Sequence, residues 1–487
     1  MKSHAANSAF APSSLEQSYG TFRSMKPSGV PWLGDIPAGW DAVRIKDAAS
    51  LVTVRSDNND HYIGLENVES GTGRFLPASD ETFSAESSAV AIQKGDILFG
   101  KLRPYLAKCH LAEWDGCCSS EFLVLRTRKQ EPRFLKYSLL SPTFIDHVNM
   151  STYGTKMPRA NWGIVGGAVA AFPPLPEQRA IADFLDEKCA AIDAIVEEAK
   201  AGIEEYAKWK QSVVFQAVTK GIPEGERHPT SDHRLPGDSR LSTSDGPDVE
   251  SRMSDVEKGS RKSDVGRRKS CPMKDSGVEW IGEIPEEWTC THVGRIFTDI
   301  LGKMLANEST NKEDTLESYV CAKDVHFSGI DTSDLKKMWF SPAEKTIYAT
   351  RNTDLLVVEG GAGAGGAAVV NDGGGYFIQN SIHLVRSKHP CADTEYLRYW
   401  IFTAVSQGYI DFVCNKATIP HFTKEKLSSM PLPLPPLPEQ RSIAAYLDEK
   451  CSSIDALIEE KKQLIEDLGV YKKSLIYETV TGKRKIA

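Results

Sequence analysis

The chain has 487 residues, which is too long for a single hydrophobic core, so we expect two to four domains. Its apolar content of 40% and charged content of 25% are those of a soluble globular protein, and no run of eighteen apolar residues predicts a membrane span. The net charge of −8 is unlike that of a typical nucleic-acid binder, although a local basic surface could still bind phosphate.

The N-terminal segment has no signal of a folded or secreted element. Residues 1–25 are rich in Ala, Ser and polar residues, and they lack the continuous apolar core and cleavage site of a secretory signal. We therefore predict a disordered lead-in. The ten cysteines form no Cys-x-x-Cys pair and no Cys/His metal spacing, so we expect no metal site and a reducing, cytoplasmic setting.

A tryptophan-containing motif follows the lead-in and returns once. Residues 26–40 read Lys-Pro-Ser-Gly-Val-Pro-Trp-Leu-Gly-Asp-Ile-Pro-Ala-Gly-Trp, and residues 274–288 read Lys-Asp-Ser-Gly-Val-Glu-Trp-Ile-Gly-Glu-Ile-Pro-Glu-Glu-Trp. Trp32 and Trp280 are 280 − 32 = 248 residues apart. A repeat of this length indicates a duplicated structural unit.

Each copy of the motif leads into a region of mixed α and β character. Short strand patterns occupy residues 89–92, 97–102 and 121–126 in the first region, and residues 354–358 and 378–385 in the second. Helical patterns follow at residues 133–149 and 394–413. The two regions otherwise share little sequence, so we expect one scaffold with two different surfaces.

Polar and basic residues gather in loops of these two regions. Cations beside Thr, Asn, aromatic and Gly residues are what phosphate positioning and base-edge readout require. An ordinary polar loop is the alternative for each residue. The candidate DNA-binding residues are Lys101, Arg103, Tyr105, Tyr153, Thr155, Lys156, Arg159 and Asn161 in the first region and Asn415, Lys416, Thr418 and His421 in the second.

Each region ends in Pro-Pro-Leu-Pro-Glu-Gln-Arg and a long pattern without proline. The copies are offset by 436 − 174 = 262 residues, and roughly half of their positions are identical up to Thr219 and Thr481. Apolar residues recur at steps of four and three, which is typical of a coiled-coil seam or one face of a bundle helix. We predict two helices of about 60 Å that pair with each other. Two ordinary core helices are the alternative.

The segment between the halves, residues 222–273, is dense in Ser, Asp, Arg, Gly and Pro and almost without aromatic residues. Such a composition cannot bury a core, so we predict a flexible linker. Its basic clusters, residues 261–262 and 267–269, could touch nucleic acid. A solvated linker is the alternative.

No motif in the chain predicts an active site. The Gly-rich run at residues 360–366 lacks the Gly-Lys-Ser/Thr ending of a phosphate-binding loop, and we expect a tight loop there. The Asp-Glu-Lys runs at residues 186–188 and 448–450 resemble a nuclease carboxylate-lysine set, but they lie within the predicted helices. Successive helical side chains fan around the axis and cannot converge on a metal, so a solvated helix face is the expected role.

The two repeated motifs together resemble those of the specificity subunit of type I restriction-modification systems. They read Ser-Gly-Val-x-Trp-x-Gly-x-Ile-Pro-x-x-Trp at the start of each half and Pro-Leu-Pro-Glu-Gln-Arg-x-Ile-Ala-x-[Phe/Tyr]-Leu-Asp-Glu-Lys before each helix. The resemblance covers residue 26 to the C-terminus. It implies an α+β fold with two pseudo-repeated α/β target-recognition domains, separated by two long antiparallel helices that form a coiled coil.

The resemblance also implies that the chain works in a complex whose subunits have different functions. Each recognition domain would read one half of a bipartite DNA site, and the helices would set the spacing and dock two modification subunits. The chain itself would be non-catalytic. Methyl transfer from S-adenosylmethionine, and ATP- and Mg²⁺-dependent translocation and cleavage, would belong to the modification and restriction subunits.

The resemblance assigns the chain to consecutive segments. Recognition domains are expected at residues 26–172 and 274–434, and spacer helices at residues 173–221 and 435–487, the latter with the tail. The linker, residues 222–273, is longer than the usual junction of the family.

Overall fold

A computed structural model describes residues 24–56, 61–77, 89–152, 157–226, 272–361, 363–390, 392–414 and 420–486. The predicted lead-in and linker lie almost wholly outside these residues. The chain divides into two compact units: unit 1 comprises Met1–Gly202 and Glu460–Ala487, and unit 2 comprises Ile203–Glu459. Each unit therefore contains a part of both long helices.

Unit 1 is built around an antiparallel sheet with the strand order β4-β10-β7-β8. Its other strands form a three-stranded sheet, β5-β9-β6, and the two-stranded pairs β1-β2 and β11-β3. The strands are β1 (Met25–Pro27), β2 (Asp35–Pro37), β3 (Asp41–Arg44), β4 (Ala49–Val52), β5 (Tyr62–Ile63), β6 (Val90–Ile92), β7 (Ile97–Gly100), β8 (Cys109–Leu111), β9 (Gly116–Cys118), β10 (Phe122–Thr127) and β11 (Val169–Phe172). The helices before the first long helix are α1 (Ile45–Ala48), α2 (Pro132–Leu140), α3 (Pro142–Met150) and α4 (Trp162–Gly167).

Unit 2 repeats this construction with the antiparallel sheet β15-β24-β21-β22. A second sheet has the order β19-β16-β23-β20, in which β16 and β23 run parallel, as β5 and β9 do in unit 1. Its strands are β12 (Met273–Asp275), β13 (Glu283–Pro285), β14 (Thr289–His292), β15 (Phe297–Leu301), β16 (Thr315–Val320), β17 (Val325–His326), β18 (Gly329–Ile330), β19 (Lys336–Phe340), β20 (Ala349–Arg351), β21 (Leu355–Val358), β22 (Ala367–Val369), β23 (Gly374–Ile378), β24 (Ile382–Ser387) and β25 (Pro431–Leu434).

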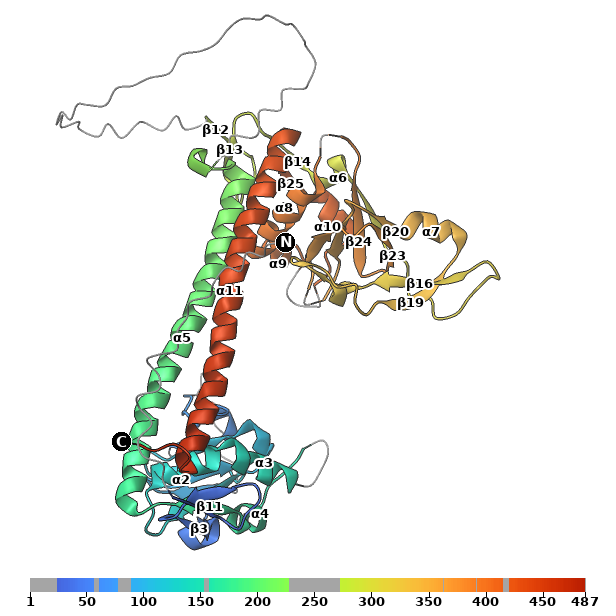
Figure 1. Cartoon of the computed structure of the whole chain (residues 1–487). Helices are drawn as coiled ribbons and strands as arrows, with labels where there is room; N and C mark the ends of the chain where they lie inside the picture. The colour runs from blue at the N-terminus through green and yellow to red at the C-terminus, as the bar shows by residue number, and fades with distance from the viewer. Residues whose placement is uncertain are drawn as a thin grey trace, which may run out of the picture. The chain divides into compact units, whose positions relative to one another are not determined.

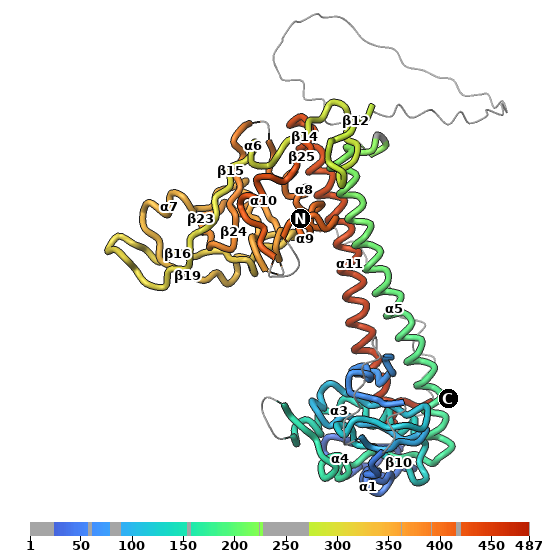
Figure 2. Tube along the Cα trace, turned by 180° about the vertical axis from the view of Figure 1, so that it is seen from behind, coloured from blue at the N-terminus to red at the C-terminus, as the bar shows by residue number. Residues whose placement is uncertain are grey.

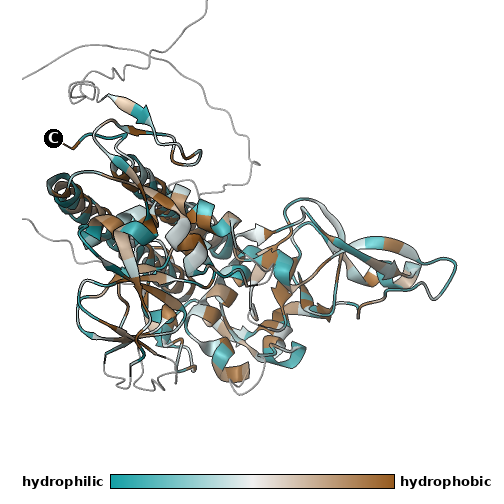
Figure 3. Cartoon of the chain, turned by 90° about the horizontal axis from the view of Figure 1, so that it is seen from below, coloured by the Kyte–Doolittle hydropathy of each residue, from teal (hydrophilic) through white to brown (hydrophobic). Residues whose placement is uncertain are grey.

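The helices of unit 2 that precede its long helix are α6 (Val293–Ile296), α7 (Pro342–Tyr348), α8 (Thr394–Ser406), α9 (Tyr409–Cys414) and α10 (Lys424–Ser429). Strand β19 forms one edge of the second sheet, and helix α7 lies beside this sheet (Figure 1). The predicted α+β class is confirmed in both units. Figure 3 shows apolar and polar residues alternating along the helices, as expected for helices with one buried face.

Three predicted elements are wrong in their extent. The helix predicted at residues 133–149 is divided into α2 and α3, because Pro142 favours the extended backbone found at Ser141 (φ −60°, ψ 138°). The helix predicted at residues 394–413 is divided into α8 and α9, with Gly408 at φ 73° between them. The strand predicted at residues 378–385 is interrupted at residues 379–381 by the turn between β23 and β24, where the Ile382 N–H donates to Gln379 O at 2.9 Å.

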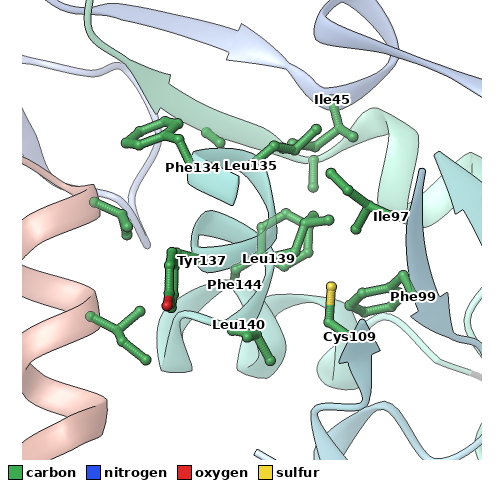
Figure 4. Packing of buried hydrophobic residues seen from close by; sticks show 14 of the residues in the cluster. Ile45, Ile97, Phe99, Cys109, Phe134, Leu135, Tyr137, Leu139, Leu140 and Phe144 are labelled. Atoms are coloured by element: carbon green, nitrogen blue, oxygen red, sulfur yellow. The ribbon is translucent and has the colours of Figure 1, made fainter. Parts of the chain in front are cut away.

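The core of unit 1 lies between its four-stranded sheet and helices α2 and α3 (Figure 4). Buried side chains from the sheet, such as Ile97 and Phe99, pack against Phe134 and Leu139 of α2 and Phe144 of α3. The same cluster contains Leu475, Ile476 and Val480 from the end of the second long helix. Each core therefore needs the end of a long helix, since unit 2 likewise buries Val214, Ala217 and Val218 of the first.

The two long helices are α5 (Leu175–Lys220), with 46 residues, and α11 (Leu437–Val480), with 44 residues. Within unit 1 they are antiparallel, because Asp193 meets Lys472 while the later Gly202 lies against the earlier Lys461. In each unit the two segments lie side by side in both views (Figures 1 and 2). The prediction of two long paired helices is confirmed.

The lysines that interrupt the apolar seam form matching ion pairs. Lys472 Nζ lies 2.6 and 2.7 Å from the carboxylate oxygens of Asp193 in unit 1, and Lys210 Nζ lies 2.8 and 2.6 Å from those of Asp455 in unit 2. The offset of 262 residues relates both lysines and both aspartates. These pairs fix the register of the helices with polar contacts that an apolar seam alone would lack.

We expect Asp193→Asn to lower the free energy of unfolding by about 1 to 2 kcal/mol, because Lys472 would lose both charge-assisted hydrogen bonds. The Lys472 and Asp193 side chains are 11% and 34% exposed, whereas those of Lys210 and Asp455 are 20% and 52% exposed. Asp455→Asn should therefore have a smaller effect. Chemical denaturation of the two variants measures the difference, and equal losses would contradict this ranking.

The Pro-Leu-Pro-Glu-Gln-Arg motif attaches each long helix to its unit through the repeated tryptophan. Trp40 Nε1 donates to Glu177 Oε2 at 3.2 Å, and Trp288 Nε1 donates to Glu439 Oε2 at 3.0 Å. Both tryptophans are almost completely buried. The two sequence motifs thus form one structural contact in each unit.

The glutamine of this motif holds the start of the helix against α2 or α8. Gln178 Nε2 donates to Pro173 O at 2.8 Å, and its Oε1 accepts the Glu131 N–H at 3.0 Å. Gln440 makes the equivalent bonds to Pro435 O and the Asp393 N–H. Buried amide groups that are fully paired in this way favour one orientation of the helix.

The aspartates of the Asp-Glu-Lys runs also have structural partners. Tyr137 Oη donates to Asp186 Oδ1 at 2.6 Å, and Tyr399 Oη donates to Asp448 Oδ1 at 2.6 Å. Burial, together with the bond to Asp186, raises the pKa of Tyr137. The predicted solvated helix face agrees with the exposure of Glu187, Lys188 and Asp448, but it missed the bonds by which the two aspartates also hold α2 and α8 to the long helices.

The cysteines at matching seam positions, Cys189 and Cys451, are buried. Burial raises the pKa of the Cys451 thiol to about 11, so it stays protonated at neutral pH. Both behave as small apolar residues of the core.

Candidate nucleic-acid interface

In unit 1, two loops that are distant in sequence form one surface beside the end of β7. The Arg103 N–H donates to Pro158 O at 2.9 Å, and the Ala160 N–H donates to Lys101 O at 2.9 Å. An isolated β-bridge joins the residues between these bonds. The structure thus brings together Lys101, Arg103 and Arg159, which the sequence proposed as candidates in separate loops.

Arg103 and Tyr105 present their side chains to solvent from a constrained backbone. Arg103 is exposed and adopts a left-handed conformation (φ 51°, ψ 65°) before the short turn Pro104–Leu106. Tyr105, on this turn, is 51% exposed. Left-handed backbone costs a residue other than glycine about 1 to 2 kcal/mol, and such strain is found most often at functional sites.

Two further candidates have partners within the unit. Arg159 Nη1 lies 3.1 Å from Glu121 Oε1, although its side chain remains 57% exposed. Asn161 caps helix α4, since its side-chain oxygen accepts the Ile164 N–H at 3.1 Å. Capping explains Asn161 without a ligand, whereas Arg159 keeps donors for one.

Unit 2 repeats the backbone arrangement with different residues. The Gly361 N–H donates to Pro420 O at 3.2 Å, and the Phe422 N–H donates to Glu359 O at 2.6 Å. The bridge between Gly360 and His421 corresponds to the bridge between Leu102 and Arg159. The candidate His421 therefore lies beside the Gly-rich run, which occupies the place of residues 101–105 in unit 1.

The sequence did not predict this correspondence, because the Gly-rich run was interpreted only as a tight loop. The loop is tightly closed, with the Gly365 N–H donating to Val358 O at 2.9 Å and the Gly366 N–H donating to Gly363 O at 2.8 Å. Gly365 has φ 83°, and a Cβ there would overlap the side chain of Ile410 in α9. The position of the two segments could have revealed the correspondence, because both directly follow a completely buried inner strand, β7 or β21.

A buried histidine supports this surface in unit 2. His383 lies with Nδ1 3.0 Å from Asp299 Oδ1 and Nε2 2.9 Å from Phe422 O. The His383 side chain is 0% exposed and that of Asp299 is 4% exposed. The contact to the Phe422 carbonyl fixes the backbone next to His421.

The remaining candidates, Tyr153, Thr155, Lys156, Asn415, Lys416 and Thr418, lie outside the described residues. After these two segments, residues 153–156 and 415–419, the described chain resumes just before Arg159 and just before His421. A DNA-binding role for these residues stays a prediction.

Exposed guanidinium, ammonium, phenol and imidazole groups on a rigid backbone can position phosphates and contact bases.

Within the described residues no group of three or more His, Cys, Asp or Glu side chains could hold a metal ion. None of the described helices is both long enough and apolar enough to cross a bilayer.

The comparisons with known proteins agree on one family. Residues 285–467 match the family model described as the type I restriction modification DNA specificity domain. The chain is 26% identical over 190 residues to the type I restriction enzyme EcoDI specificity subunit of Escherichia coli, covering 38% of this chain and 43% of that protein. It is 23% identical over 479 residues to the putative type I restriction enzyme MjaX specificity subunit of Methanocaldococcus jannaschii, covering 93% of this chain and 96% of that protein.

The fold is also that of a solved structure. A chain from a study entitled "Structural basis underlying complex assembly and conformational transition of the type I R-M system" superposes with a TM-score of 0.64 at 19% identity, covering 92% of this chain and 99% of that chain. The duplicated motifs, the two units of matching construction and the family match agree with one another. Residues 285–467 thus match the type I restriction modification DNA specificity domain, and nearly the whole chain is similar in sequence to a putative type I specificity subunit.

Proposed function

We propose that the chain is the DNA-sequence-recognition subunit of a type I restriction-modification complex, and that each unit reads one half of a bipartite site. The observation that carries the proposal is the duplicated surface beside β7 and β21. The backbone bonds that join its two loops are the same in both units, whereas its side chains differ. One scaffold with two different surfaces is suited to two different half-sites.

The two surfaces offer different recognition chemistry. Unit 1 presents the donors of Lys101, Arg103 and Arg159, which suit phosphates and the acceptor edge of guanine. Unit 2 presents His421 beside a glycine-rich segment whose side chains are no larger than a methyl group, so that DNA could approach its backbone closely. We propose that residues 26–172 and 274–434 are the two recognition domains.

We further propose that residues 173–221 and 435–487 act as the spacer between the half-sites. A helix of 46 residues is about 69 Å long at 1.5 Å per residue. One turn of DNA is about 34 Å. The length of the spacer would then set the number of base pairs between the half-sites.

The long helices carry exposed apolar side chains at matching positions, which we propose as docking sites for two modification subunits. Trp209 and Leu457, 48% and 38% exposed, belong to unit 2, and Tyr471 and Ile195, 49% and 45% exposed, belong to unit 1. The offset of 262 residues relates Trp209 to Tyr471 and Ile195 to Leu457. Exposed apolar surface of this kind is typical of protein interfaces.

Replacing Trp209 or Tyr471 by alanine should each remove one modification subunit, and the double variant should remove both. Loss of a central aromatic side chain from an interface typically costs about 2 to 4 kcal/mol, or a weakening of roughly thirtyfold or more. Native mass spectrometry of the assembled complex counts the subunits. Retention of both subunits by the double variant would show that they dock elsewhere.

We propose that the chain itself is non-catalytic. Methyl transfer from S-adenosylmethionine and ATP- and Mg²⁺-dependent translocation and cleavage would then be carried out by modification and restriction subunits. The support is the family, together with the lack of a catalytic motif in the sequence.

A bandshift with the modification subunits present tests the proposal. The complex should bind one bipartite duplex, and scrambling either half should reduce binding to the non-specific level. Partner binding without any sequence preference would instead indicate a scaffold. Methyl transfer or cleavage by the purified chain alone would show that it is an enzyme.

A further inference from the structure

Helices α3 and α9 end at the candidate interface in an equivalent way. The His147 ring stacks on Trp32 at a centroid distance of 4.9 Å, and the Tyr409 ring stacks on Trp280 at 5.0 Å. The next residue of each helix, Val148 or Ile410, is buried or nearly so in the core. The offset of 262 residues thus holds through this helix although the two sequences differ.

This equivalence draws attention to Met150 and Phe412, which are also 262 residues apart. Met150 is 86% exposed and Phe412 is 85% exposed, and no other large apolar residue in the described part of the chain exceeds 75%. A single exposed apolar residue needs no explanation. Its occurrence at one structural position in both units indicates a shared role outside the unit's own core.

Both side chains belong to helices that pack against the surface described above. Helix α3 packs against the turn Pro104–Leu106, which carries Tyr105 and follows Arg103. Helix α9 packs against the Gly-rich loop through Ile410. Met150 and Phe412 therefore each belong to a helix that contacts one of the two loops of the candidate interface.

Each unit also carries positively charged side chains at its candidate interface. Within the described residues Lys101 and Arg103 form no ion pair, so their charges remain for an anionic partner. In unit 2 the exposed Lys424 begins the helix that follows His421. A surface that carries both cations and an exposed apolar side chain suits DNA, in which stacked apolar bases lie between phosphates, better than it suits an apolar protein surface.

We propose that Met150 and Phe412 are apolar wedges that insert between neighbouring base pairs, one in each half-site. This inference rests on the proposed DNA-recognition function and adds the residues that deform the duplex. Methionine and phenylalanine are both used as wedges, because a slender or flat side chain fits between two bases. Partial unstacking would let the flanking cations reach further along the bent backbone.

The test uses the full chain assembled with its modification subunits on a duplex that carries the mapped site. Adenines in and beside each half-site are replaced one at a time by 2-aminopurine, whose fluorescence rises when it is unstacked. We expect a rise at one step in each half. Met150→Ala should abolish it in the half read by unit 1 only, and Phe412→Ala in the other half only.

Each alanine variant should also bind the site roughly tenfold more weakly, in the range found for loss of one stacked side chain. Met150→Leu should retain most of the signal, since leucine is also a wedge residue. Met25→Ala, which removes an exposed methionine from strand β1 of the same unit, is the matched control and should change nothing.

Three results would overturn the proposal. Specific binding with no fluorescence rise, or a rise that both alanine variants keep, would show that the side chains of Met150 and Phe412 do not enter the stack while leaving the recognition function intact. Weaker assembly of either variant with modification subunits in the absence of DNA would show that these side chains dock protein instead. Loss of sequence preference in the wild-type complex would contradict the recognition function itself.

Discussion

Trp288→Ala is expected to lower the free energy of unfolding of unit 2 by about 3 to 5 kcal/mol, the usual cost of removing a large aromatic side chain from a core. Trp288 is 1% exposed and belongs to the main cluster of the unit. Its indole also donates to Glu439, so the variant leaves a cavity and an unpaired carboxylate at the start of α11.

Matched variants separate these two effects. Trp288→Phe keeps most of the packing and loses the hydrogen bond, so we expect about 1 to 2 kcal/mol. Trp40→Ala should reproduce the large loss in unit 1, because Trp40 is 2% exposed and donates to Glu177 in the same way. Trp339→Ala, at a half-buried position of β19, should cost less.

Chemical denaturation gives the total loss, and hydrogen–deuterium exchange assigns it to a unit. Amides of α8 should exchange faster in Trp288→Ala, and amides of α2 faster in Trp40→Ala. A loss below about 1 kcal/mol in both alanine variants would show that the repeated motif does not hold the long helices in place.

Inserting one heptad into both long helices is expected to lengthen the gap between the recognised half-sites by about three base pairs. Seven helical residues add about 10.5 Å, and base pairs are about 3.4 Å apart. A whole heptad keeps the apolar seam on the same face. The bases read in each half should stay the same, because the insertions leave both recognition surfaces unchanged.

The boundaries of the two units give the insertion points, after Gly202 and after Glu459. Both residues of the Asp193–Lys472 pair then stay in unit 1, and both residues of the Lys210–Asp455 pair stay in unit 2. Insertion into one helix alone is the control, since it breaks the pairing register and should weaken binding. Mapping the methylated sites of the variant measures the gap, and an unchanged gap would show that the helices are not the spacer.

Features that are encoded locally could be predicted from the sequence. The steps of four and three and the absence of proline were sufficient for two long helices, which end within two residues of the expected positions. Lys210 and Lys472 marked a common irregularity, but their aspartate partners lie on the other helix and no local pattern connects them.

Features that depend on tertiary contacts could not be predicted in the same way. Arg103 and Arg159 come together only because backbone bonds join two loops far apart in sequence. The Gly-rich run was misjudged because its equivalence to residues 101–105 is one of position and not of residue type. The equivalence of Met150 and Phe412 likewise becomes visible only through the stacking of His147 and Tyr409 on the two tryptophans.

Modular reading of a bipartite site is the central claim, and a domain exchange tests it most directly. Residues 32–172 are replaced by the corresponding segment of another specificity subunit, and the positions methylated by the reconstituted complex are mapped. The account predicts that one half-site changes to that of the donor, while the other half-site and the gap stay the same. A change in both halves, or in neither, would contradict it.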